Sequence, residues 1–188
     1  MGHIRISQMN TLTRISRFVA MLVLCLAGAT AAEPRPTSEF TTTDRKKVKV
    51  LEDSAREKNP QGDYFEHLCP GLGGYKVFHL GDDARSWIDL QFGGKTTELR
   101  RDTFVACQPG QMPCKANNVV EWRGVRKGNT FVPYAIIYRM GAVLDDGKRT
   151  PVETLVIIKL DREKSRVVAH VPGKDDAKAQ ELADKLCR

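Results

Sequence analysis

The sequence predicts an α+β fold, in which an antiparallel β-meander sheet of roughly six to eight strands carries one C-terminal α-helix packed on it. Three observations support this prediction. Short segments of alternating apolar and polar residues follow one another with polar turns between them, as in a meander. The last segment changes to a helical period. Four cysteines remain in the part of the chain expected to be exported, so we expect the domain to be disulfide-stapled.

Residues 1–31 have the pattern of a secretory signal peptide. Arg14 and Arg17 precede an uncharged apolar run over residues 18–26, and Ala29-Thr30-Ala31 fits the small-residue cleavage rule. The apolar run is shorter than the roughly 20 residues that span a bilayer, so a membrane anchor is disfavoured. We therefore expect a periplasmic or secreted protein with no membrane span after cleavage.

The remaining chain is long enough for one ordinary domain. It has 157 of the 188 residues. Residues 32–45 contain proline, threonine and glutamate without periodicity, and we predict a flexible lead-in there. Residues 46–188 are predicted to form a single α+β domain.

The charge pattern is mild. The net charge of the whole chain is +7, and without Arg5, Arg14 and Arg17 it is +4, from 27 basic and 23 acidic residues. The charges are interspersed, which is typical of ordinary solvation and gives no indication of nucleic-acid binding. An envelope protein or an acidic envelope polymer is the kind of partner that this charge allows.

The run Thr154–Leu160 is apolar and rich in β-branched residues, so we predict a strand covered on both faces near the middle of the sheet. Further strands are predicted at 46–51, 75–80, 86–92, 103–107, 119–125, 131–140 and 166–171. Near the C-terminus, Ala179, Leu182, Ala183 and Leu186 form one stripe of a helix. Asp175 suits its N-cap.

The cysteines allow three connectivities, from which we predict Cys107–Cys114 and Cys69–Cys187. The first pair closes a short loop that contains proline and glycine. The second would tie a glycine-rich turn to the C-terminal helix, with Leu186 buried beside Cys187. A zinc site is disfavoured because the spacing has no C-x-x-C pair, and no cofactor is expected.

No catalytic motif rises above background. His67, His79 and His170 form neither H-x-H nor H-E-x-x-H, and no serine has a nucleophile-elbow context. The segment C-P-G-L-G-G at residues 69–74 fits a structural turn better than an anion nest, because it lacks the phosphate-loop pattern.

Five charged residues on predicted strands and turns are the candidate binding residues: Asp83, Arg85, Glu121, Arg123 and Arg139. In the first interpretation they form a charge ladder across neighbouring strands, and in the second they grip an acidic partner. The charge ladder is favoured, because such pairs are common in half-exposed sheets.

The chain resembles a family of small exported proteins of alphaproteobacteria that has no characterised activity. The residues that carry the resemblance are C-P-G-L-G-G-Y at 69–75, D-A-R-S at 83–86, V-E-W-R at 120–123 and A-I-I-Y-R at 135–139. The resemblance implies export and disulfides, and it implies no chemistry.

Two functions from different classes are compatible with these patterns. The first is a non-enzymatic binding or envelope-accessory module, including an inhibitor-like protein. The second is a small hydrolase that acts on a cell-envelope polymer. The lack of a nucleophile motif favours the first.

Overall fold

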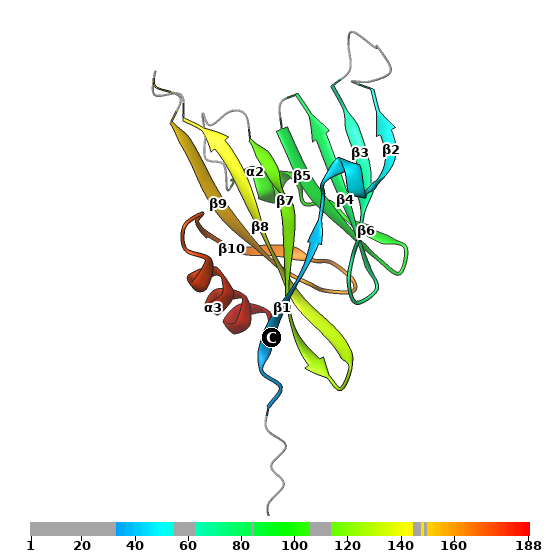
Figure 1. The fold of residues 1–188 in the computed structure, drawn as a ribbon, viewed down its shortest axis with the longest axis vertical. Helices are drawn as coiled ribbons and strands as arrows, with labels where there is room; N and C mark the ends of the chain where they lie inside the picture. Colours follow the sequence, from blue (N-terminus) through cyan, green and yellow to red (C-terminus); the bar gives the residue numbers. More distant parts are fainter. Residues whose placement is uncertain (1–32, 55–62, 84, 106–113, 145–147, 149) are drawn as a thin grey trace, which may run out of the picture. The chain divides into compact units, whose positions relative to one another are not determined.

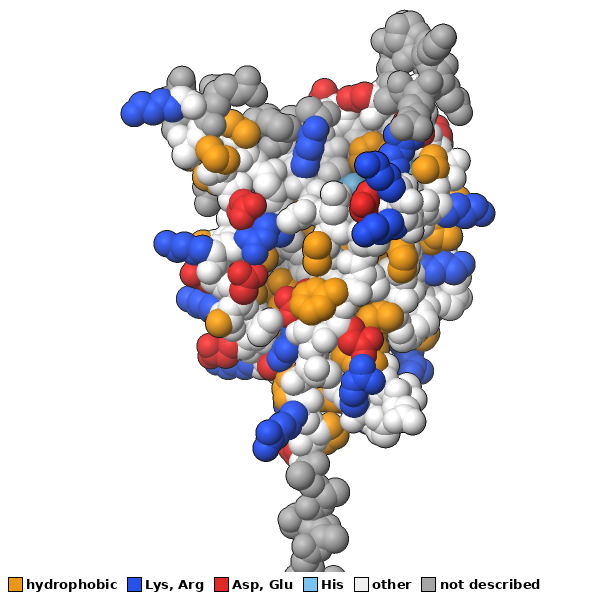
Figure 2. Space-filling model, in the orientation of Figure 1, with side chains coloured by type: hydrophobic (Ala, Val, Ile, Leu, Met, Phe, Trp, Pro, Cys, Tyr) orange, Lys and Arg blue, Asp and Glu red, His pale blue; other side chains and the backbone are white. Residues whose placement is uncertain are grey.

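Two antiparallel sheets of five strands each make up most of the fold (Figure 1). The computed structural model describes residues 33–54, 63–83, 85–105, 114–144, 148 and 150–188. Within this range, Pro34–Arg188 form one unit. Basic and acidic side chains are interspersed on the face shown in Figure 2.

Sheet A has the strand order β1-β7-β8-β9-β10, with β1 at Pro36–Thr42, β7 at Lys115–Lys127, β8 at Thr130–Val143, β9 at Pro151–Lys159 and β10 at Arg166–Pro172. Sheet B has the order β2-β3-β4-β5-β6, with β2 at Lys49–Asp53, β3 at Phe65–Cys69, β4 at Tyr75–Asp82, β5 at Arg85–Phe92 and β6 at Lys95–Thr97. The helical elements are η2 at Arg45–Lys47, α2 at Arg100–Val105 and α3 at Asp176–Cys187.

The prediction of an α+β fold with a single meander sheet was wrong. Strands β2 to β6 form one meander and β7 to β10 form another, so the fold is mostly β, with two sheets and a short C-terminal helix. Alternation of apolar and polar residues locates strands, but it does not show where the chain leaves one sheet for another.

Several segments differ from the sequence prediction. The strand expected at 46–51 starts only at Lys49, because η2 occupies Arg45–Lys47, and the strands β3 and β6 were not predicted. The expected lead-in at 32–45 contains β1, which pairs with β7 from Pro36 to Thr42. The expected strand at 103–107 is wrong, because α2 occupies Arg100–Val105. The helix brings Leu99 and Thr103, four residues apart, onto the same buried side.

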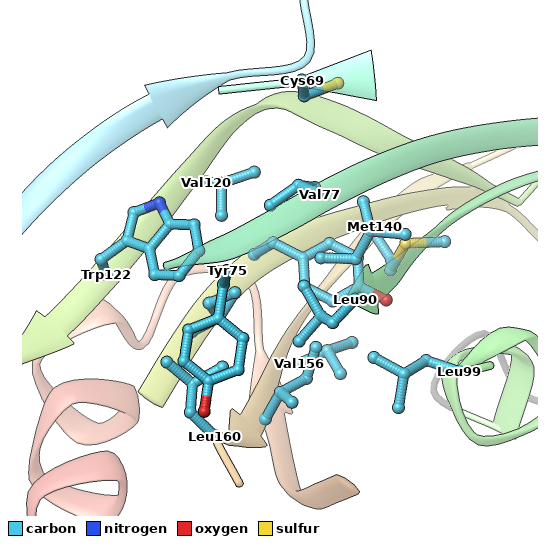
Figure 3. Packing of buried hydrophobic residues seen from close by; sticks show 14 of the residues in the cluster. Cys69, Tyr75, Val77, Leu90, Leu99, Val120, Trp122, Met140, Val156 and Leu160 are labelled. Atoms are coloured by element: carbon cyan, nitrogen blue, oxygen red, sulfur yellow. The ribbon is translucent and has the colours of Figure 1, made fainter. Parts of the chain in front are cut away.

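The main core lies between the facing sides of the two sheets (Figure 3). Sheet B contributes Val77, Ile88 and Leu90, and sheet A contributes residues from three adjacent strands, among them Val120, Trp122, Ile136, Tyr138, Met140, Val156 and Ile158. Trp122 is fully buried, and its indole N–H donates a 2.9 Å hydrogen bond to the hydroxyl of Thr41 on β1. A buried indole therefore has the polar partner it needs, and β1 is held to the core strands.

Helix α3 covers the opposite face of sheet A. A second apolar cluster there joins Ala135, Ile137, Leu155, Ile157 and Val171 of the sheet to Ala179, Ala183 and Cys187 of the helix. Small alanine side chains let the helix approach the sheet closely. The prediction that the strand around residues 154–160 is covered on both faces is confirmed, because every residue from Leu155 to Ile158 is buried.

The glycine-rich segment forms the turn between β3 and β4. Gly73 and Gly74 have φ angles of +61° and +87°, and the amide of Tyr75 donates to the carbonyl of Leu72. Positive φ values of this kind favour glycine, which explains the composition of the turn. The segment therefore forms the expected turn, and its interpretation as structural in preference to an anion nest stays a prediction.

The predicted disulfide Cys69–Cys187 is wrong. Both cysteines are free and buried. Sheet A separates them, since Cys69 lies in the core between the sheets and Cys187, the last residue of α3, packs on the opposite face of sheet A. Leu186 was expected to be buried, yet it is 40% exposed, and Cys187 takes the inward position. Cys107 lies outside the described residues, so Cys107–Cys114 stays a prediction, and no disulfide joins two described cysteines.

We expect Cys69 and Cys187 to resist alkylation in the folded protein and to react completely after unfolding in urea. Burial raises the pKa of both thiols to about 11, so the reactive thiolate is scarce and shielded. Iodoacetamide labelling followed by peptide mapping measures this. Fast labelling of either cysteine without urea, or a peptide that links the two, would contradict the structure.

Candidate functional site

A hollow of about 340 Å³ lies beside α2 and the start of β5. We call it the arginine hollow. It is lined by Arg85 of β5, by Glu98, and by Arg100, Arg101 and Phe104 of α2. Three guanidinium groups therefore surround one aromatic side chain and one carboxylate.

The inward side of α2 fixes which residues face the hollow. Leu99 packs in the main core, and its amide donates a 2.8 Å hydrogen bond to the carboxylate of Asp89. One helical turn later, the hydroxyl of Thr103 lies 2.7 Å from the hydroxyl of Tyr138 on sheet A. With these two positions directed inward, Arg100 and Arg101 are exposed.

The three arginines differ in how far their charge is already compensated. Arg100 lies over the Trp87 ring at 4.5 Å and pairs with Asp82 at 3.1 Å. Arg85 lies over the Phe104 ring at 5.5 Å, and its Nε is buried without a hydrogen-bond partner among the described residues. The guanidinium of Arg101 makes no ion pair or hydrogen bond with another described residue.

The arginine hollow is suited to binding an acidic group. A buried guanidinium N–H without an acceptor is costly, and a carboxylate or phosphate oxygen would satisfy it. Phe104 offers an apolar wall, and Glu98 can accept a hydrogen bond from a neutral N–H or O–H of the same ligand. None of the described residues that line the hollow is serine, cysteine or histidine, so it presents no nucleophile of those types.

The five predicted binding residues do not form one site. Asp83 and Arg85 flank the turn between β4 and β5, and their charged groups lie 3.8 Å apart at the arginine hollow. Asp83 is 80% exposed there, so this contact contributes little. Glu121, Arg123 and Arg139 lie on the outer face of sheet A, where they contact α3 instead.

Arg123 attaches α3 to the sheet. Its Nε and Nη2 donate to the two carboxylate oxygens of Asp184 at 3.0 and 2.6 Å, and the hydroxyl of Tyr134 donates to the same carboxylate. Burial acts to raise the pKa of Asp184, but the hydrogen bonds from Arg123 and Tyr134 outweigh it and lower that pKa. Arg123 is thus engaged within the chain, and its role is structural.

Two further contacts fix the same helix. Arg139 donates to Asp176 and to Glu153, each at 2.9 Å, and to the carbonyl of Gly173. Glu121 accepts a hydrogen bond from Gln180 of α3 at 2.8 Å. The charged pairs seen here run between sheet and helix, rather than only across neighbouring strands.

Sequence reasoning missed Arg100, Arg101 and Phe104. Their segment was expected to become a strand at Thr103, and a strand would place the two arginines on opposite faces. The spacing of Leu99 and Thr103 is the signal that could have indicated a short helix with both arginines outward.

The histidines do not assemble a metal centre. His67 and His79 face each other from β3 and β4, with ring centroids 5.9 Å apart and Phe65 packed against both. Neither ring has a hydrogen-bond partner among the described residues. His170 is exposed on β10 of the other sheet. In the described part of the chain, no group of three metal-binding side chains comes together.

Burial lowers the pKa of both paired histidines. For His79 burial is the largest cause, the neighbouring His67 adds to it, and the pKa falls to about 4. The backbone of Thr43 opposes this shift but does not reach hydrogen-bonding geometry. For His67, burial comes first and the charge of Arg45 second, and Asp53 opposes them. The two rings are therefore neutral in the folded protein at pH 7.

The comparisons with known proteins identify no relative: no protein-family model, no curated protein and no solved structure matches this chain. Among the described residues, no helix has the length and apolar character needed to cross a membrane.

We expect Asp184→Ala to lower the free energy of unfolding by about 2 kcal/mol, because it leaves the buried guanidinium of Arg123 without its carboxylate. This expected loss of stability is smaller than that for removing one partner of a fully buried ion pair, because the Asp184 side chain is 26% exposed. Urea denaturation measures the change. Lys185→Ala, at an exposed position on the same helix, is the control and should change stability little. Equal stability of the two variants would rule out the proposed role of Arg123.

We expect the free energy of unfolding to fall as the pH drops from about 6.5 towards 4. The unfolded chain binds protons on His67 and His79 that the folded chain excludes, so stability is lost below the unfolded pKa of 6.5. The shift of His79 corresponds to about 3 kcal/mol. In urea denaturation at several pH values, His79→Leu should flatten the decline, whereas His170→Asn should not. An unchanged pH profile for His79→Leu would contradict this account.

Proposed function

We propose that the protein is an exported, non-enzymatic binding module that holds an acidic group of a cell-envelope partner in the arginine hollow. The observation that carries the proposal is the hollow of about 340 Å³, in which Arg85 has a buried donor without an acceptor and Arg101 has no ion pair among the described residues. The signal-peptide pattern over residues 1–31 and the resemblance to exported alphaproteobacterial proteins support the envelope as the location.

The chemistry of the hollow favours binding over hydrolysis. Guanidinium groups bind carboxylates and phosphates through several hydrogen bonds and cannot act as bases at neutral pH. Glu98 is the only carboxylate among the described lining residues, so the hollow does not supply the pair of carboxylates that most glycosidases use. The described lining residues would bind and orient a ligand held there, and they offer no carboxylate pair, serine, cysteine or histidine to cleave it.

Peptidoglycan fragments and the same fragments with their carboxyl groups amidated are a matched pair of probes. We expect the native fragments to bind and the amidated ones to bind about tenfold more weakly, because a charge-assisted hydrogen bond contributes roughly 1.5–3 kcal/mol. Calorimetry measures the affinities. Because Arg101 is exposed and its guanidinium makes no ion pair or hydrogen bond with another described residue, Arg101→Gln should weaken binding without changing the fold.

Lys127→Gln is the control for the loss of one positive charge, since Lys127 is exposed at the far end of β7. It should leave the affinity for native fragments unchanged. Equal binding of native and amidated fragments would overturn the role of the arginine hollow. Release of cleaved products during the same incubation would instead establish the alternative, a hydrolase acting on an envelope polymer.

A further inference from the structure

A second hollow, of about 110 Å³, lies on the outer face of sheet A between β1 and the start of α3. We call it the sheet hollow. Its floor is apolar, formed by Ile137 and Leu155, which are 2% and 3% exposed. Its rim includes Phe40 and Val119 on one side and the carboxylates of Glu121 and Asp176. The space suits a single extended side chain rather than a larger ligand.

The apolar part of the rim is exposed to solvent. Phe40 is 62% exposed and Val119 is 49% exposed. They lie on adjacent strands, since β1 pairs with β7 and Phe40 is opposite Glu121. Figure 2 shows hydrophobic side chains gathered over β1 and the strands beside it, with acidic side chains next to them. An exposed aromatic side chain beside a hollow is typical of a binding hot spot.

The polar part of the rim carries net negative charge. Arg139 also lines the sheet hollow, but its guanidinium is bound to Asp176, Glu153 and the carbonyl of Gly173. Glu121 receives hydrogen bonds from neutral side chains only, those of Ser38 and Gln180. These neutral donors leave the charge of Glu121 in place. Arg123, which interacts electrostatically with Glu121, is itself paired with Asp184, so the carboxylates still outnumber the cations and one more cation would be stabilised here.

We propose that the sheet hollow binds a lysine or arginine side chain of a protein partner. The aliphatic stem of that side chain would lie on Ile137 and Leu155, and its charged head would reach Glu121 and Asp176. An apolar residue of the partner next to it would pack on Phe40 and Val119. The surface is on the sheet opposite the arginine hollow, so this inference does not depend on the function proposed above.

Three capped tripeptides test the proposal on the full chain: Leu-Lys-Leu, Leu-norleucine-Leu and Leu-Glu-Leu. Norleucine keeps the aliphatic stem of lysine and lacks the charge. We expect the lysine peptide to shift the amide resonances of Phe40, Val119 and Glu121, and the norleucine peptide to bind about tenfold more weakly. The glutamate peptide should cause no shift at these positions.

Substitutions separate the two parts of the surface. Glu121→Gln keeps the size of the side chain and an oxygen that can accept from Ser38 and Gln180, and it should abolish the preference for lysine over norleucine. Phe40→Ala should weaken both the lysine peptide and the norleucine peptide about tenfold. Leu51→Ala is the control, because Leu51 is an exposed apolar residue (44%) on sheet B, and it should change nothing.

Several results would overturn the proposal. Equal binding of the lysine and norleucine peptides would show that the positive charge of lysine does not contribute to binding. A lack of resonance shifts up to about 10 mM peptide would show that the hollow is not a binding site at all. Shifts of Phe40 and Val119 that depend on protein concentration alone, with dimers in sedimentation, would identify a second copy of the chain as the occupant instead.

Discussion

The two-sided burial of sheet A is the constraint on which the structure depends. The side chains of β8 and β9 point alternately to opposite faces, and both faces are apolar, from Ala135 to Tyr138 and from Leu155 to Ile158. Water must be excluded from both faces of sheet A, and a single packed element can cover only one of them. Sheet B covers one face and α3 covers the other. Burying these apolar side chains stabilises the fold by about 25 cal/mol for each Å² of apolar surface that is removed from water.

This constraint explains why charged residues of sheet A hold α3 in place. Helix α3 buries mainly alanines, which remove little apolar area, so packing alone holds it weakly. Arg123 and Arg139 supply directional contacts at its two ends, to Asp184 and to Asp176. Because these contacts occupy both guanidinium groups, neither arginine is available to bind an external acidic partner. The net negative rim of the sheet hollow follows from the carboxylates that remain near them.

The arginine hollow arises from a different part of the same core. Helix α2 is fixed by Leu99 and Thr103, which are both buried, and its other side carries two arginines beside Arg85. The two hollows thus have opposite charge character and lie on different sheets. Unsatisfied polar groups mark a further region: the imidazoles of His67 and His79 are buried without a hydrogen-bond partner in the described part of the chain, and such groups persist only while they remain neutral. They make the fold sensitive to acid without forming a site.

The sequence by itself determined the positions of most strands and of the last helix, because alternation, β-branched runs and glycine turns are local patterns. It also placed Arg85 beside a predicted turn, and β5 begins at that residue. Only the tertiary structure decided how many sheets these strands form and which face of sheet A each element covers. Arg123 and Asp184 are 61 residues apart, so no local pattern could show that this arginine is already bound. The wrong disulfide prediction for Cys69 and Cys187 has the same cause. Each position taken alone is compatible with a disulfide, and only the tertiary structure shows that sheet A lies between them.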